Sequence, residues 1–252
     1  MVLSVSNRVI SGVAAMFAAG AMVFAAPASA QWSDVAEACY QSEGEPSSAV
    51  ILCTQAIEAG DLDDESLALT YSNRGNSYYD LGEYDRAVGD YNIALDLLPG
   101  DPVTLSNRGA AFLELGQNAQ ALEDLNEAIR LYPDNPVALT NRCWIHAVEG
   151  RFELARFDCD EALGLEPEDP IALASRAYVF MQLGDVEAAQ VDADQAVVYG
   201  DHLWQTHFYR GLAYESAGDL TRAAESYNRA VDLAPDEPRI RQKLAEIGAA
   251  EQ

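Results

Sequence analysis

Residues 102–135 read PVTLSNRGAAFLELGQNAQALEDLNEAIRLYPDN, and the pattern of these 34 residues recurs along the chain. Numbered from the first residue of each copy, position 8 is a small residue, position 15 is Gly, and positions 20 and 27 are Ala. Position 32 is Pro in every copy except the fourth. A fixed period of this length indicates a repeat protein built from stacked supersecondary units. Five copies follow one another in register, and they begin at Ala68, Pro102, Pro136, Pro170 and Trp204.

Each copy is predicted to form a pair of helices. The small residue, an aromatic residue three positions later and the apolar residues between them recur at helical spacing. Gly at position 15 ends the first helix, because glycine tolerates the left-handed backbone found there. Pro at position 32 ends the second helix. One hairpin cannot bury both of its faces, so neighbouring copies must stack into an all-α array.

This pattern resembles the tetratricopeptide repeat (TPR) family, over about two-thirds of the chain. The shared features are the small residue at position 8, the aromatic at 11, Ala at 20 and 27, and Pro at 32. The resemblance implies a right-handed α–α superhelical solenoid of TPR helical hairpins. Three departures are local: Asp201 replaces the Pro of the fourth copy, His146 replaces the aromatic of the third, and Arg stands at position 7 where the family has Leu.

The two ends of the chain differ from the repeats. Residues 1–30 combine Arg8, an apolar run over 9–26 and the small-residue motif Ala28-Ser29-Ala30, which predicts a cleaved signal peptide and an exported, periplasmic protein. The alternative, a membrane anchor, needs about 20 apolar residues with suitable flanks. Residues 31–62 resemble a divergent N-terminal hairpin, 63–237 hold the five units, and 238–252 contain a C-terminal capping helix.

The charge of the chain is strongly acidic. It has 41 acidic and 15 basic residues, a net charge of −26, and Lys243 is the single lysine. Such a chain is expected to repel nucleic acid and anionic lipid surfaces, so neither nucleic-acid binding nor stable membrane insertion is predicted. The charge is also sufficient to keep an exported solenoid in solution.

Four cysteines fall into two pairs that are centred on predicted turns. Residues equidistant from an antiparallel turn lie at the same level of the two helices, which predicts the disulfides Cys39–Cys53 and Cys143–Cys159. The alternative is four buried free thiols that pack as small apolar residues. Zinc is not predicted, because the spacings are too long and no histidine accompanies them.

Arg at position 7 is accompanied by Asp at position 23 of four copies. The predicted structural pairs are Arg74–Asp90, Arg108–Asp124, Arg142–Asp158 and Arg176–Asp192. Each pair could form a bidentate guanidinium–carboxylate ion pair between the helices of one hairpin. The alternative is a ladder of arginines that binds anions. Arg210 has Ser226 at the corresponding position, so no partner is predicted for it.

The resemblance also implies a partner-binding groove along the first helices, lined by positions 2, 5, 6, 9 and 12. Asn at position 6 of three copies is similar to the asparagine ladder of O-linked N-acetylglucosamine transferase repeats and could hold a peptide backbone. The alternative is that these amides bond within their own hairpins. Trp144 is expected to face the groove and to support little of the core. The predicted groove residues are Asn73, Asn76, Tyr79, Asn107, Asn141, Trp144, Tyr178 and Phe208.

Nothing in the sequence indicates catalysis. No nucleophile motif, phosphate-binding loop or metal signature is present, and the three histidines (His146, His202 and His207) do not share a helix face. We therefore expect a non-enzyme without cofactor or metal. The prediction is a protein–protein interaction module or scaffold of the cell envelope that binds a protein or peptide in the concave groove. The alternatives are an accessory subunit of an exported enzyme complex and a structural spacer.

Overall fold

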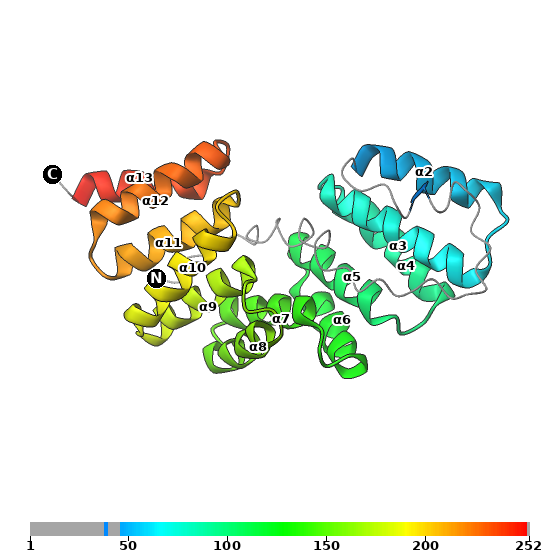
Figure 1. Ribbon diagram of the computed structural model, residues 1–252, viewed down its shortest axis with the longest axis horizontal. Helices are drawn as coiled ribbons and strands as arrows, with labels where there is room; N and C mark the ends of the chain where they lie inside the picture. Colours follow the sequence, from blue (N-terminus) through cyan, green and yellow to red (C-terminus); the bar gives the residue numbers. More distant parts are fainter. Residues whose placement is uncertain (1–37, 40–45, 251–252) are drawn as a thin grey trace. The chain divides into compact units, whose positions relative to one another are not determined.

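The computed structural model describes residues 38–39 and 46–250 of the chain (Figure 1). These residues form twelve helices, α2 to α13, and they divide after Pro133 into two compact units. The predicted signal peptide, residues 1–30, lies outside the described part, as do residues 31–37 and 40–45 of the predicted N-terminal hairpin.

The first unit contains two complete hairpins, α3–α4 and α5–α6, preceded by α2. Helix α2 packs on α3, and α4 packs on α5, so each hairpin contacts the next. The helices are α2 (Pro46–Ala59), α3 (Asp64–Asp80), α4 (Tyr84–Leu97), α5 (Pro102–Glu114) and α6 (Asn118–Leu131).

The second unit contains three hairpins, α7–α8, α9–α10 and α11–α12, followed by the single helix α13. The helices are α7 (Pro136–Val148), α8 (Phe152–Leu165), α9 (Pro170–Leu183), α10 (Val186–Tyr199), α11 (Trp204–Ser216), α12 (Leu220–Leu233) and α13 (Pro238–Ala250). The predicted fold class, an all-α array of stacked helical hairpins, is therefore confirmed.

The first helix of several repeats begins at a capping residue followed by Pro. The Asp101 carboxylate accepts a hydrogen bond from the Thr104 backbone N–H at 2.8 Å, and Asp169 accepts from Ile171 at 2.9 Å. Such bonds satisfy donors that a helix leaves unpaired at its start, and Pro at the first helical position has no N–H to satisfy. Pro102, Pro136 and Pro170 occupy that position in α5, α7 and α9.

The glycine at position 15 makes the turn of every hairpin. All five of these glycines have positive φ, between +72° and +83°, in the left-handed region that a side chain disfavours. In the first repeat the chain closes with hydrogen bonds from Gly82 N–H to the Tyr79 carbonyl (2.9 Å) and from Glu83 N–H to the Tyr78 carbonyl (2.8 Å). The predicted end of each first helix is therefore observed.

The residues at positions 8 and 24 face each other across each hairpin, and the sizes of their side chains are matched. A Cβ built on Gly75 would lie 2.6 Å from the Tyr91 ring, and one built on Gly109 would lie 2.9 Å from Leu125. In the last repeat Gly211 faces Tyr227 in the same way. Only glycine leaves room for the larger residue in these three hairpins, while the fourth packs Ala177 and Ala193 in one buried cluster.

Helix α13 covers the end of the second unit. Ile240 and Ile247 are buried, and the Lys243 ammonium donates to Glu215 of α11 at 2.9 Å. The Tyr227 hydroxyl donates to the same carboxylate at 2.6 Å, which fixes α11, α12 and α13 together. Among the described helices, none has the length and apolar character needed to cross a membrane.

Candidate functional site

The predicted groove residues of the first unit lie on α3 and α5, and several of them bond to one another. The Asn107 amide donates to the Asn76 side-chain oxygen at 2.9 Å, and the Tyr91 hydroxyl donates to that same oxygen at 2.8 Å. Asn76 thus links two neighbouring repeats. The half-buried Asn73 side chain has no hydrogen-bond partner within the described residues, so its amide is open to a ligand.

Tyr79 is largely enclosed by its surroundings in the first unit. Its side chain is buried, its hydroxyl lies 3.4 Å from Glu114 Oε1, and its ring meets Tyr84 edge-on at 5.2 Å. Burial, with the nearby Glu114 charge, raises the pKa of the Tyr79 phenol well above its ordinary value. The neutral phenol therefore contributes an aromatic surface and a hydroxyl at any physiological pH.

In the second unit, the predicted groove residues form an aromatic cluster across α7, α9 and α11. The Trp144 ring lies 5.6 Å from Tyr178 and 5.7 Å from Tyr209, and Phe208 lies 5.6 Å from Tyr209. These separations are typical of attractive edge-to-face packing. The cluster joins three successive repeats, and position 6 of the last repeat, Tyr209, belongs to it.

The cluster corrects the expectation that Trp144 supports little of the core. Trp144 is only 4% exposed, and Phe208 is 7% exposed, so both rings are packed inside the unit. Tyr178 is half-buried and therefore still presents part of its ring to solvent. A ligand on this face would meet Tyr178 first, with Trp144 packed against it.

Asn141, at position 6 of the third repeat, is fully buried on α7. Neither its amide nitrogen nor its amide oxygen has a hydrogen-bond partner within the described part of the chain. An unpaired buried polar group costs about 1–3 kcal/mol. Asn141 is therefore neither an exposed rung of a ladder nor a residue that bonds within its own hairpin.

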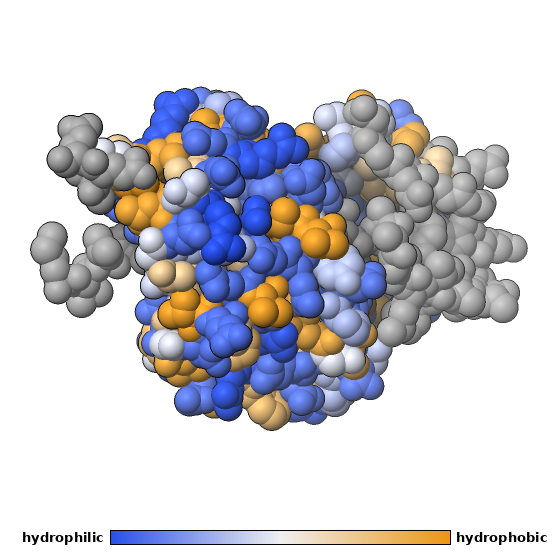
Figure 2. Space-filling view, turned by 60° about the vertical axis from the view of Figure 1, so that its left-hand side comes forward, coloured by the Kyte–Doolittle hydropathy of each residue, from blue (hydrophilic) through white to orange (hydrophobic). Residues whose placement is uncertain are grey.

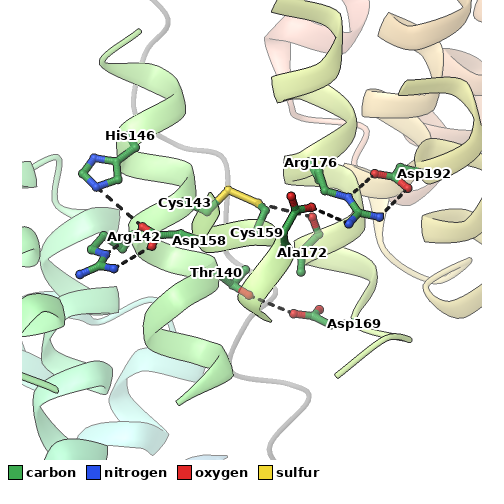
Figure 3. Close-up of a disulfide and its surroundings, with 11 residues drawn as sticks. Thr140, Arg142, Cys143, His146, Asp158, Cys159, Asp169, Ala172, Arg176 and Asp192 are labelled. Carbon is green, nitrogen blue, oxygen red and sulfur yellow. Dashed lines mark hydrogen bonds and ion pairs between the residues drawn. A yellow bond between two sulfur atoms is a disulfide. The ribbon is translucent and has the colours of Figure 1, made fainter. Parts of the chain in front are cut away.

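The four predicted arginine–aspartate pairs are present in the structure. Asp124 accepts hydrogen bonds from Arg108 Nε and Nη2, each at 2.7 Å. The other three pairs have the same bidentate geometry. The aspartates at position 23 are buried, whereas the arginine side chains keep a partly exposed edge. With these carboxylates bound, the arginines are not available as an anion-binding ladder. Figure 3 shows two of the pairs, Arg142–Asp158 and Arg176–Asp192.

The arginines also contact the preceding repeat, which was not predicted from the sequence. Arg108 Nη1 donates to Asn92 at 2.7 Å, and Arg176 Nη1 donates to Asp160 at 2.8 Å. Arg210, for which no partner was predicted, donates to Asp194 at 2.7 Å in the same way. A signal was present in the sequence, because position 25 is Asn or Asp in all five copies: Asn92, Asn126, Asp160, Asp194 and Asn228.

Two disulfides are present. Cys39 and Cys53 have Cα atoms 4.8 Å apart, and Cys143 and Cys159 have Cα atoms 5.4 Å apart. The second pair occupies positions 8 and 24, so a disulfide joins α7 and α8 where three other hairpins have glycine and a larger residue (Figure 3).

Non-reducing peptide mapping of the purified protein is expected to yield the linked peptides Cys39–Cys53 and Cys143–Cys159. Each bond closes a loop of 14 or 16 residues in sequence separation, for which chain entropy suggests about 3 kcal/mol. Reduction should therefore lower the melting temperature. Quantitative labelling of all four thiols in unreduced protein would contradict this prediction.

His207 and His146 are both packed against the protein. His207 is buried, with Nε2 2.9 Å from the Asp201 carbonyl oxygen. Burial, together with Arg151, lowers the pKa of His146, so that its ring is neutral at neutral pH. Among the described residues, no group of three or more His, Cys, Asp or Glu side chains could hold a metal ion.

Comparison with known proteins identifies the repeats. The profile described as "Tetratricopeptide repeat" matches residues 72–136, 106–170 and 175–238, which together span more than half of the chain. No curated protein sequence matches the chain.

Solved structures of similar fold include a tetratricopeptide repeat protein from Parabacteroides merdae. It is 19% identical, with a TM-score of 0.65, over 84% of this chain and 82% of that one. PilW, a type IV pilus biogenesis factor, is 19% identical, with a TM-score of 0.65, over 85% and 99%. A thermophilic TPR protein of Thermus thermophilus is 23% identical, with a TM-score of 0.62, over 71% and 98%. At these identities the likeness shows the fold alone.

Proposed function

The chain belongs to the tetratricopeptide repeat family of protein-binding modules, and from this premise we propose that it holds an extended segment of another polypeptide against the first helices of its hairpins. The observation that carries the proposal is the aromatic cluster of Trp144, Tyr178, Phe208 and Tyr209, which runs across three successive first helices. Tyr178 is the half-buried member of this cluster, and an aromatic ring that packs firmly on its neighbours and keeps an exposed edge is a typical anchor of protein interfaces.

One polar residue supports the same proposal. Asn73 in the first unit has an amide open to a ligand, and an amide both donates and accepts, as a peptide backbone requires. The fully buried Asn141 of the second unit is not exposed to such a backbone.

We also propose that the module acts outside the cytoplasm, in the cell envelope. The leader-like residues 1–30 and the two disulfides support export, because disulfides persist in oxidising compartments and are rare in the cytosol. The partner is a protein or peptide, and the module itself performs no chemistry.

Replacing Tyr178 with a photo-crosslinking phenylalanine analogue is expected to trap this partner in envelope fractions, where mass spectrometry can identify it. Tyr178→Ala should then weaken binding of the identified partner about thirtyfold, corresponding to roughly 2 kcal/mol for an interface anchor. Tyr178 suits this test because its half-buried ring can be removed with less damage to the core than Trp144.

Glu123→Ala and Glu127→Ala are the matched controls. Both residues lie on the second helix α6, away from the first-helix residues, and their replacement should leave affinity unchanged. If binding survives Tyr178→Ala combined with Asn73→Ala but fails in the α6 variants, the partner does not use the first-helix face and the proposal is wrong.

A further inference from the structure

The second helices α8 and α10 of the second unit expose large apolar side chains. Phe157 is 60% exposed and Leu154, one helical turn earlier, is 54% exposed, while Val191 on α10 is 53% exposed. Single exposed apolar residues are ordinary, but a group of them on neighbouring elements is not. Figure 2 shows one face of the molecule as hydrophilic surface interrupted by small apolar groups.

The five repeats supply an internal comparison for these positions. Position 22 is Phe157 and Val191 in the third and fourth repeats, but it is Gly89, Glu123 and Glu225 in the others. Position 19 is Leu154 in the third repeat, whereas the first and last repeats have Arg there. Since the helical geometry is the same in every repeat, the fold does not require an apolar residue at either position. The apolar character is thus specific to α8 and α10.

A shallow pocket adjoins Val191 between α9 and α10. It is lined by Phe180, Ala188 and Val191 and by the charged residues Arg176, Asp185, Glu187 and Asp192. Arg176 also donates to Asp160 on α8 at 2.8 Å. Because Asp160 follows Phe157 by three residues, the two side chains share a face of α8, which places Phe157 on the side of α8 that Arg176 contacts.

Acidic side chains predominate around this surface. Glu153, Asp160 and Glu161 lie on α8 and Glu187 lies on α10, whereas the basic Arg156 pairs with Glu153 and Arg176 is bound to Asp160 and Asp192. An apolar centre with an excess of acidic residues around it selects a partner with apolar anchors and basic side chains. The net charge of −26 disfavours a second copy of this chain as that partner.

We propose that Leu154, Phe157 and Val191, with the pocket between α9 and α10, form a second docking surface for a basic amphipathic segment of another polypeptide. An apolar side chain of that segment would enter the pocket beside Phe180, and its Lys or Arg residues would meet the surrounding acidic side chains. This surface lies on the second helices, so the protein can hold one segment at Tyr178 and another here.

The test uses a fluorescent amphipathic peptide of Leu and Lys, with Leu at helical spacing, titrated with the full exported chain at physiological salt. Phe157→Glu and Val191→Glu each introduce the residue that Glu123 and Glu225 already supply at position 22, so the fold should tolerate them. Each variant should weaken peptide binding at least about tenfold. Val198→Glu is the matched control, because Val198 is 75% exposed and lies outside the pocket.

The sign of the charge change makes the result decisive. If charge attraction alone held the peptide, an added Glu would strengthen the binding of a Lys-rich peptide. Weaker binding by the Glu variants therefore shows that the peptide contacts the apolar side chain that was replaced. A peptide with Ser in place of Leu, or Glu in place of Lys, should bind much more weakly to the unmodified chain. Equal or tighter binding by Phe157→Glu would overturn the proposal. So would self-association of the chain that Phe157→Glu abolishes, because the surface would then be occupied by a second copy.

Discussion

Arg108→Ala is expected to destabilise the protein by about 3–5 kcal/mol, since it removes the partner of a buried carboxylate. Asp124 is 5% exposed and loses both of its 2.7 Å bonds from Arg108, while Asn92 of the preceding repeat loses a third. Replacing Arg108 and Asp124 together with apolar residues should cost less than the sum of the single losses. Urea unfolding, followed by circular dichroism, measures all three variants.

The ion pair Arg130–Glu127 on α6 is the control for this experiment. Its side chains are 65% and 43% exposed, so Arg130→Ala should cost less than about 1 kcal/mol. If Arg108→Ala costs no more than Arg130→Ala, or if the losses at Arg108 and Asp124 simply add, then the two side chains do not depend on one another and the repeats are held together by apolar packing.

Trp144→Ala is expected to cost about 3–5 kcal/mol, the range for removing a large buried aromatic side chain. Trp144 is 4% exposed and packs against Tyr178 and Tyr209, so its loss leaves a cavity that involves all three hairpins of the second unit. Thermal unfolding should show a lowered midpoint, with helical content retained at low temperature.

Phe157→Ala serves as the control for Trp144→Ala, because Phe157 is an aromatic residue of the same unit that is 60% exposed. Its replacement should leave the melting temperature nearly unchanged. A midpoint unaffected by Trp144→Ala would restore the expectation from sequence that this ring projects into solvent and supports little of the core.

Interactions within one hairpin could be predicted from the sequence, because the repeat period fixes which residues face each other. Arg108 and Asp124 are one such pair, and Cys143 and Cys159 are another. The turn glycines followed from the same register, since a helix must end where the left-handed residue stands.

Interactions between hairpins could not be predicted in this way. Arg210 bonds to Asp194 of the preceding repeat, and Asn107 bonds to Asn76, a residue of another first helix. The Asn or Asp at position 25 of every copy was a signal for the first contact, but whether it meets the next Arg depends on how far one hairpin is rotated against the next. The burial of Trp144 has the same origin, because Tyr209 comes from a helix two repeats away.

The matched sizes of the side chains at positions 8 and 24 determine which segments can be exchanged between repeats by recombination. Gly211 leaves room for the Tyr227 ring, whereas Ala177 faces Ala193, so joining α9 to α12 would force the Ala177 methyl group against Tyr227. The reverse hybrid, α11 with α10, would leave a void where the ring is missing. Hairpins with different pairs at these positions are thus interchangeable only as wholes, and duplications or deletions that respect their ends conserve a fit that exchanging one helix between such hairpins would destroy.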